Sequence, residues 1–275
     1  MKPRRFDYVR PDSADEAVAV LAEYGDAASV LAGGQSLMAM LNLRVAEPAV
    51  LIDIARLNEL DYVRVVDDKV EVGAAVTQNQ LKDWAELPCK LPLLAAVLPF
   101  VGHFQTRNKG TVCGSIAHAD PSSEIPLVLA TLGGEVLLRS HRGTRVLAAA
   151  EFQRGMLTTA RAADELIAAV RFPTQSTRRV AFREVARRHG DFAIIAVAAY
   201  VEDRNTLRIG IGGVADRPAV RCKRLDGAAD ARDTFEALAG ELEGYDDLHA
   251  SARLRRDLLR RVGPVVVEEA LRCAA

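Results

Sequence analysis

Two short glycine-centred segments, far apart in the chain, constrain the fold more than any other feature of the sequence. The first glycine segment is Ala-Gly-Gly-Gln-Ser at residues 32–36, and the second is Thr-Val-Cys-Gly-Ser at residues 111–115. Glycine lets backbone N–H groups approach a phosphate without side-chain bulk over them. The chain has neither a Gly-x-Gly-x-x-Gly fingerprint nor a P-loop. The pair therefore predicts a dinucleotide whose diphosphate lies between two glycine loops.

Composition is that of a folded protein that does not bind nucleic acid. The 275 residues are 49% hydrophobic and 27% charged, with a formal net charge of −1. This balance lacks the surplus of cations that nucleic-acid phosphates require. No apolar segment is long enough to span a bilayer, and residues 1–7 lead into no signal-peptide core. We therefore expect a soluble, cytoplasmic protein without a membrane span.

The sequence contains no recognisable metal-ligand pattern. The four cysteines, Cys89, Cys113, Cys222 and Cys273, form no Cys-x-x-Cys pair, and the five histidines form no ligand cluster. Separate thiols are typical of a reducing compartment. We predict no metal site on this chain, so that any redox metal would belong to another chain.

The first 60 residues predict an α/β unit. We expect strands at 5–10, 28–32 and 49–54, and a helix that begins at Ser13 and ends at Gly25. A short helix at 36–43 would follow the first glycine segment. Ligands of α/β proteins commonly bind at the carboxyl ends of such strands, where this segment lies.

The middle of the sequence predicts a hairpin, several helices and three further strands. The expected strands are 62–66, 70–72, 135–139, 144–147 and 166–172. Helices are expected to begin at Thr77, to cover 91–98, and to cover 125–132 with Asp120 as the N-cap. An irregular stretch at 105–110 would precede the second glycine segment.

A polar stretch at 174–179 is the expected linker to a C-terminal unit. Strands at 180–186, 193–201 and 206–211 predict a three-stranded antiparallel sheet, with helices after it. One helix carries an apolar face of Leu254, Leu258, Leu259 and Val262, with Arg255, Arg256, Arg260 and Arg261 opposite. We interpret these arginines as a solvated face, with an interface as the second interpretation. The expected domains are 1–175, with subdomains of about 1–57 and 58–175, and 176–275.

Residues 32–37 (AGGQSL) and 111–126 (TVCGSIAHADPSSEIP) resemble the two flavin-binding signatures of the FAD-carrying medium subunit of molybdenum hydroxylases. This family includes xanthine dehydrogenase, carbon monoxide dehydrogenase and bacterial hydroxylases of aromatic N-heterocycles. The resemblance runs from Phe6 to the C-terminal helices. It implies an α+β protein with a two-subdomain FAD-binding fold of the p-cresol methylhydroxylase type. A C-terminal domain of a three-stranded antiparallel sheet with helices would follow.

The resemblance also implies a function. The chain would be an oxidoreductase subunit with noncovalent FAD, in a complex with a small iron–sulfur subunit and a large molybdopterin subunit. Electrons would pass from the iron–sulfur clusters through FAD to an external acceptor. The substrate, an aromatic N-heterocycle or a similar small molecule, would be oxidised on the large subunit. Such complexes are usually dimers of heterotrimers.

The family's binding residues carry over onto specific positions, all of which would contact FAD. They are Leu31, Ala32, Gly33, Gly34, Gln35 and Ser36, then Gly102, Thr111, Cys113, Gly114, Ser115 and Asp120, and finally Ile167, Arg183 and Phe192. Asp120 would accept a hydrogen bond from a ribityl or ribose hydroxyl, and Phe192 would cover one flavin face. No residue takes a catalytic role.

The second signature departs from the family's usual Thr-x-Gly-Gly-Asn. Cys113 replaces the first glycine of that pattern and Ser115 replaces the asparagine. A side chain at a position with φ > 0 would be strained. We therefore expect an ordinary φ at Cys113, and no redox role for a thiol without a resolving partner.

Two other functions stay open. A self-sufficient flavin oxidase or reductase on the same fold, comparable to the cell-wall enolpyruvyl reductases, would need an acid–base constellation over the flavin. The sequence shows no convincing cluster of that kind. A scaffold that has lost FAD is the third possibility, and the intact glycine segments argue against it.

Overall fold

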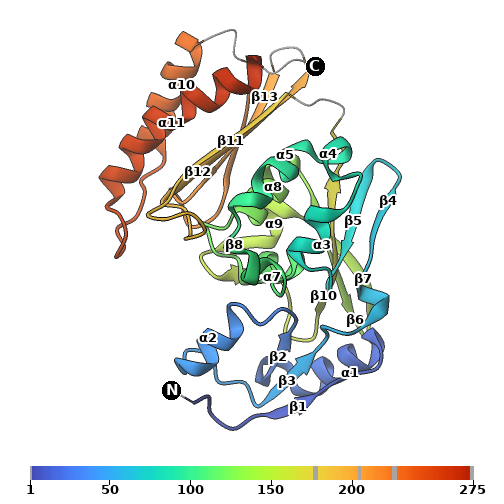
Figure 1. Ribbon diagram of the computed structural model, residues 1–275. Coiled ribbons are helices and arrows are strands. Elements are labelled where there is room, and N and C mark those ends of the chain that lie inside the picture. The colour runs from blue at the N-terminus through green and yellow to red at the C-terminus, as the bar shows by residue number, and fades with distance from the viewer. Residues whose placement is uncertain (1, 176–178, 204–205, 225–227, 273–275) are drawn as a thin grey trace.

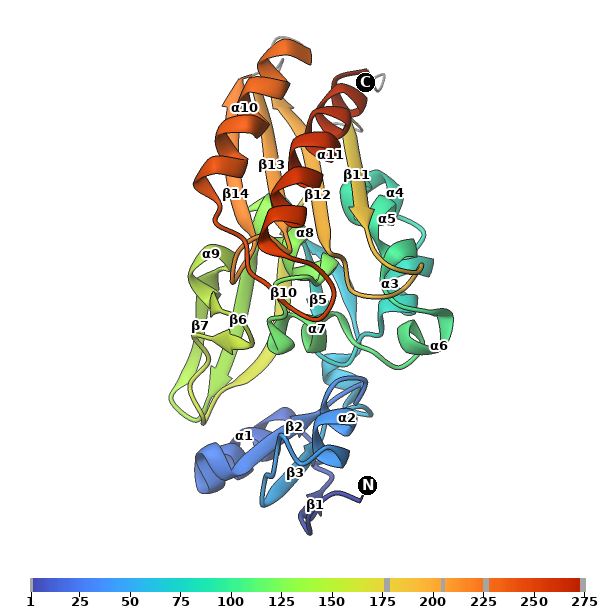
Figure 2. The ribbon, with the colours of Figure 1, turned by 90° about the vertical axis from the view of Figure 1, so that its left-hand side faces the viewer.

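The computed structural model describes residues 2–175, 179–203, 206–224 and 228–272. They form an N-terminal lobe (residues 2–60), a middle lobe (61–175) and a C-terminal lobe (179–272), arranged one after another along the molecule (Figure 1 and Figure 2). Positions 176–178 of the expected linker lie outside the described residues. Within the described ranges, no helix is both long enough and apolar enough to cross a membrane.

The N-terminal lobe is a parallel sheet in the order β1-β3-β2 with two α-helices and two short 3-10 helices among its described residues. Ser13 caps the first helix by accepting a hydrogen bond from the Glu16 N–H at 3.1 Å, as predicted, and Gly25 ends it with a φ of 51°. The first glycine segment follows β2, at the carboxyl end of the sheet. The elements are β1 (Asp7–Val9), α1 (Ala14–Tyr24), η1 (Gly25–Ala27), β2 (Ala28–Leu31), α2 (Leu37–Asn42), β3 (Val50–Asp53) and η2 (Asn58–Leu60).

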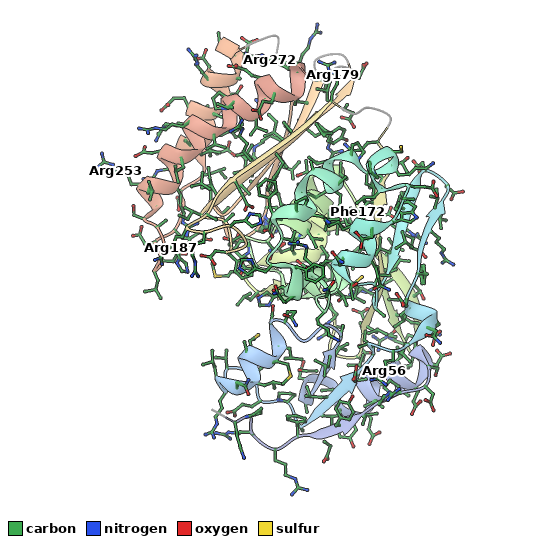
Figure 3. All side chains as sticks on the ribbon, viewed as in Figure 1. Arg56, Phe172, Arg179, Arg187, Arg253 and Arg272 are labelled. Atoms are coloured by element: carbon green, nitrogen blue, oxygen red, sulfur yellow. The ribbon has the colours of Figure 1, made fainter. Side chains whose placement is uncertain are left out.

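The middle lobe is built on an antiparallel sheet in the order β4-β5-β10-β6-β7. Phe172, on the central strand β10, has no exposed surface and lies in the interior of this lobe (Figure 3). The strands are β4 (Val63–Val66), β5 (Lys69–Gly73), β6 (Glu135–Ser140), β7 (Gly143–Ala148), β8 (Gln153–Gly155), β9 (Thr158–Thr159) and β10 (Leu166–Pro173). The helices are α3 (Gln78–Asp83), α4 (Leu87–Lys90), α5 (Pro92–Val97), η3 (Leu98–Phe100), α6 (Phe104–Arg107), α7 (Val112–His118), α8 (Glu124–Leu132) and α9 (Ala149–Phe152).

Three local predictions in this lobe are wrong. The second glycine segment is not a loop but the N-cap and first turn of α7, because the Thr111 hydroxyl accepts a hydrogen bond from the Gly114 N–H at 2.9 Å. The stretch 105–110, predicted to be irregular, contains most of α6. Asp120 is not the N-cap of α8, which begins after Ser123. Its carboxylate instead accepts from the Ser122 N–H at 2.8 Å and closes a turn ahead of the helix.

The C-terminal lobe has an antiparallel sheet in the order β11-β12-β13-β14, one strand more than predicted among the described residues. The missed strand lies at the edge, and its polar residues Arg221, Lys223 and Arg224 are indistinguishable from a loop by sequence pattern. The elements are β11 (Val180–Val185), β12 (Ile195–Asp203), β13 (Thr206–Gly212), β14 (Ala219–Arg224), α10 (Ala228–Glu241) and α11 (Ala252–Arg272).

Strand β12 is apolar from Ile195 to Val201 because both of its faces are covered there. Ala196, Ala198 and Tyr200 belong to the core shared with the middle lobe. Val197 and Ala199 belong to the second core, under α10 and α11. Alternate residues of one strand thus serve two cores, and the C-terminal sheet is fixed to the middle lobe.

Arg255 corrects the prediction of a solvated arginine face on α11. Its side chain is 1% exposed, and its Nη1 donates to the carbonyl oxygens of Ile194 at 2.5 Å and Gly213 at 2.7 Å. Its Nη2 donates to the Asp247 carboxylate at 2.6 Å, and the guanidinium lies 4.2 Å from the ring centroid of Tyr245. A charged residue is buried this deeply only when such partners satisfy it.

Candidate functional site

A cavity of about 500 Å³ is lined by residues of the N-terminal and middle lobes and by one turn of the C-terminal lobe. Both glycine segments line it, together with the 101–106 turn, the beginning of β10 and the turn that contains Gly190 and Phe192. This volume lies within the usual range for sites that bind small molecules or cofactors.

The two glycine segments lie against each other. A Cβ atom on Gly33 would overlap the carbonyl oxygen of Lys109 and would lie 2.7 Å from the Cα of Gly110. Gly110 in turn accepts a hydrogen bond from the Gln78 N–H at 2.8 Å. The absence of a side chain at Gly33 therefore brings residues 32–36 directly beside the start of the second segment. The predicted meeting of the two segments is confirmed.

The first glycine segment offers most of the free N–H donors. Among the described residues, the N–H groups of Gly34, Gln35 and Ser36 have no hydrogen-bond acceptor, and the Ser36 hydroxyl makes no capping bond. Gly34 has a φ of 69°, a conformation that L side chains rarely adopt. Successive unpaired N–H groups at such a turn are suited to binding an anion.

The second glycine segment contributes fewer donors than the sequence predicts. In the first turn of α7, the Val112 N–H donates to the Val76 carbonyl at 3.1 Å and the Ser115 N–H to the Thr111 carbonyl at 3.2 Å. The Gly114 N–H is taken by the Thr111 hydroxyl. Within the described chain this leaves the N–H groups of Thr111 and Cys113 without a hydrogen-bond acceptor. The two segments line one cavity, but the second offers fewer unpaired N–H donors than the first.

Most of the predicted binding residues line the cavity. Those that do are Ala32, Gly33, Gly34, Gln35, Ser36, Gly102, Thr111, Cys113, Gly114, Ser115, Ile167 and Phe192. Phe192 is 54% exposed, so it is a rim residue and not part of the core.

Leu31, Asp120 and Arg183 are not among the residues that line this cavity. Leu31 is the last residue of β2, and the Asp120 carboxylate is engaged by Ser122. Arg183 points to the opposite side of its strand, where its Nε donates to the Glu269 carboxylate of α11 at 3.0 Å. A strand alternates its side chains between faces, and Arg183 lies on the face of β11 that packs against α11.

Cys113 has an ordinary helical conformation, as expected from its small side chain. Its thiol is buried and lies 3.6 Å from the carbonyl oxygen of Val72. Burial raises the pKa of the Cys113 thiol, because the thiolate would lose its hydration. The residue is therefore unreactive at neutral pH.

Glu124 is a cavity residue that sequence reasoning missed. It is 4% exposed, and burial raises its pKa to about 7, with the negative charge of Asp120 adding to the effect. Burial also raises the pKa of Glu184 on β11 to about 8, and the charge of Glu124 contributes. One carboxylate oxygen of Glu184 is buried without a hydrogen-bond partner. A glutamate in the first turn of a helix is ordinarily an exposed dipole partner, so its sequence position gave no signal.

Comparison with known proteins gives consistent matches. Residues 4–175 match the family described as the FAD binding domain in molybdopterin dehydrogenase. Caffeine dehydrogenase subunit beta of Pseudomonas sp. (strain CBB1) is 40% identical over 79% of this chain and 76% of its own length. The 6-hydroxypseudooxynicotine dehydrogenase complex subunit alpha of Paenarthrobacter nicotinovorans is 33% identical over 98% of this chain and 96% of its own. The crystal structure of quinoline 2-oxidoreductase from Pseudomonas putida 86 matches with a TM-score of 0.91 and 32% identity over 98% of both chains.

Proposed function

We propose, from the premise that this chain belongs to the family of FAD-binding subunits of molybdopterin dehydrogenases, that it holds noncovalent FAD in the cavity between its lobes. It is then the flavoprotein subunit of a heteromeric molybdenum hydroxylase. The observation that carries the proposal is the contact of Gly33 with Lys109 and Gly110, which places both glycine segments on one cavity.

The residues of the cavity fit FAD. The unpaired N–H groups of Gly34, Gln35 and Ser36 are donors for a diphosphate, and Cys113, whose N–H is also unpaired among the described residues, lines the same cavity. Phe192 at the rim provides an apolar surface for an aromatic ring. When bound, FAD supplies the redox chemistry, while the chain binds it, orients it and limits access to it.

The wider assembly is part of the proposal. We infer a small subunit with iron–sulfur clusters and a large molybdopterin subunit, assembled as a dimer of heterotrimers in the cytoplasm. An external acceptor would take the electrons that leave FAD. The names of the caffeine and quinoline relatives support an aromatic N-heterocycle as the substrate of the large subunit. We also retain the predicted domain boundaries at about residues 57 and 175.

One observation favours the alternative of a self-sufficient oxidase or reductase. Glu124 lines the cavity, and its pKa of about 7 is a property of general acids. A cavity acid of this kind could serve an enzyme that acts directly on its substrate. Turnover of an organic substrate by the isolated chain, with neither partner subunit present, would establish this second function in place of the first.

The proposed function is tested by expressing the chain alone and with its partner subunits. The purified chain should show oxidised-flavin absorbance, and denaturation should release FAD intact. Substrate should reduce this flavin only when the iron–sulfur and molybdopterin subunits are present. A colourless chain that takes up no FAD in a titration would contradict the proposal.

A further inference from the structure

Arg161 is the one lysine or arginine among the residues that line the cavity in the described part of the chain. It lies in the turn between β9 and β10. The carboxylates of Glu124 and Glu165 also belong to the lining. Within the described residues, a cavity for a diphosphate therefore contains a single guanidinium beside two glutamates.

One edge of the Arg161 guanidinium is fixed by its own turn. Its Nη1 donates to the carbonyl oxygens of Glu165 at 2.7 Å, Ala162 at 3.0 Å and Ala163 at 3.4 Å. Its Nε and Nη2 make no hydrogen bond within the described residues, and neither is sealed from solvent. The other edge of the guanidinium is thus held open and ready to donate.

The neighbouring carboxylate does not neutralise Arg161. Glu165 is taken by Arg145, whose Nε and Nη2 donate to it at 2.5 Å and 2.8 Å, and by the Ala162 N–H at 2.7 Å. Among the described residues, no carboxylate lies within ion-pair distance of Arg161. Burial lowers the pKa of Arg161, because its charge loses hydration without gaining a close partner. An anionic ligand in the cavity would compensate for that loss.

The position of Arg161 indicates which part of a dinucleotide it meets. Phe192 and Gly102 line the end of the cavity next to the C-terminal lobe, and the half-exposed Phe192 leaves that end accessible for electron exchange. Arg161 lines the same cavity, and the charge of Asp26 in the N-terminal lobe acts on its guanidinium. The diphosphate donors of residues 34–36 belong to the same cavity. The nucleotide half of FAD would therefore extend toward Arg161.

We propose that Arg161 is a specificity-determining residue that binds the AMP half of FAD, through its phosphate or its ribose, and so selects FAD over FMN. The proposal rests on the proposed function, since it requires a flavin in the cavity. The open guanidinium edge can donate two hydrogen bonds to the anionic nucleotide, a geometry that lysine does not reproduce.

The test is a titration of the flavin-free full-length chain with FAD and, separately, with FMN, followed by flavin fluorescence. Arg161→Met should weaken FAD binding about ten- to a hundred-fold, as expected for the loss of a charged hydrogen bond. FMN lacks the AMP half, so its affinity should stay within about two-fold. Arg161→Lys keeps the charge and should lose less FAD affinity than Arg161→Met.

Arg142→Met is the matched control. Arg142 forms an ion pair with Asp164, which belongs to the same turn as Arg161. The Arg142 side chain is 60% exposed and does not line the cavity. Both flavins should therefore bind to Arg142→Met as they bind to the wild type. Equal weakening of FAD and FMN by Arg161→Met, or no weakening of either, would overturn the proposal. If Arg161→Met does not fold, as judged by circular dichroism, the Arg161→Lys titrations decide in the same way. Failure of the wild type to bind any flavin would instead refute the proposed function.

Discussion

Gly33 and the carbonyl group of Lys109 are so close that no side chain fits between them. This contact joins the N-terminal lobe to the middle lobe at the cavity. The sequence predicts that Gly33 binds the diphosphate, and the structure shows that the packing of the chain also requires a glycine there. Gly33 therefore belongs both to the lining of the cavity and to the contact between the two lobes.

Gly33→Ala tests that double role. A Cβ atom would push the two segments apart, so the free energy of unfolding should fall by about 1–3 kcal/mol and FAD should be lost. Urea unfolding and the flavin content of the purified protein measure the two effects. Gly240→Ala is the control, since a Cβ there in α10 meets no atom within 4 Å, and it should be neutral or slightly stabilising. An unchanged flavin content in Gly33→Ala would contradict the assigned contact.

Gly34→Ala separates backbone strain from ligand binding. Gly34 and Gly133 both have a φ of 69°, but only Gly34 lines the cavity. Alanine at either position should lower the free energy of unfolding by about 1–2 kcal/mol, since φ is unfavourable for a side chain. Only Gly34→Ala should also weaken FAD binding, measured by titration of the flavin-free protein. Equal loss of FAD affinity in both variants would show that the effect is general destabilisation.

The strands and the location of the site were predictable because they depend on local patterns. Alternating and continuous apolar runs predicted most strands, and β12 is apolar because it serves two cores. The two glycine segments predicted one shared site. These signals need no knowledge of distant contacts.

The errors arise where distant contacts decide the structure. Sequence pattern places Arg255 in solvent because it lies opposite the apolar face of its helix, but the carbonyl groups of Ile194 and Gly213, far away in sequence, accept hydrogen bonds from its side chain. Arg161 gave no sequence signal, because a lone arginine in a polar turn is ordinarily exposed. Arg183 was assigned to the site, and only its pairing with Glu269 shows which face of β11 it occupies.

The raised pKa of Glu124 predicts a pH dependence of stability in the flavin-free protein. Its pKa rises from 4.5 in the unfolded chain to about 7 in the folded chain. Between pH 4.5 and about pH 7, the unfolded chain has therefore lost a proton that the folded chain retains. The stability contributed by the protonated group is present at low pH and is lost as pH rises through about 7.

Glu124→Gln removes this titration. Relative to the wild type, the variant should be more stable at pH 8 by up to about 3 kcal/mol, with the difference vanishing near pH 4. Urea unfolding at several pH values measures it. Glu23→Gln, on the exposed surface of α1, should follow the wild-type curve. Parallel curves for Glu124→Gln and the wild type would show that the carboxyl group is not buried as described.

The burial of Cys113 predicts a difference in thiol reactivity. Its thiol is inaccessible, whereas Cys222 on β14 is exposed. In the native flavin-free protein, Cys222→Ser should remove one thiol that reacts rapidly with Ellman's reagent, while Cys113→Ser should leave the number of rapidly reacting thiols unchanged. After denaturation, both variants should have one thiol fewer than the wild type. Rapid native reaction of Cys113 would mean that the wall formed by α7 opens.

Arg255 and Arg253 lie two positions apart on α11, yet their substitutions should differ greatly. Arg253 is 88% exposed at its side chain and lies at the beginning of the helix, at the edge of the molecule (Figure 3). Arg255→Met would remove the donor to one oxygen of the Asp247 carboxylate and to two carbonyl oxygens, and should lower the free energy of unfolding by about 3–5 kcal/mol. Arg253→Met should change it by less than about 0.5 kcal/mol.

The Arg255 substitution should also reach the cavity. Ile194, whose carbonyl group receives Arg255, lies two residues after Phe192 on the same chain segment. Loosening that segment should make bound FAD more accessible, so iodide should quench flavin fluorescence more strongly in Arg255→Met than in Arg253→Met at a temperature where both are folded. Equal quenching in the two variants would show that Arg255 stabilises the C-terminal lobe but does not position Phe192.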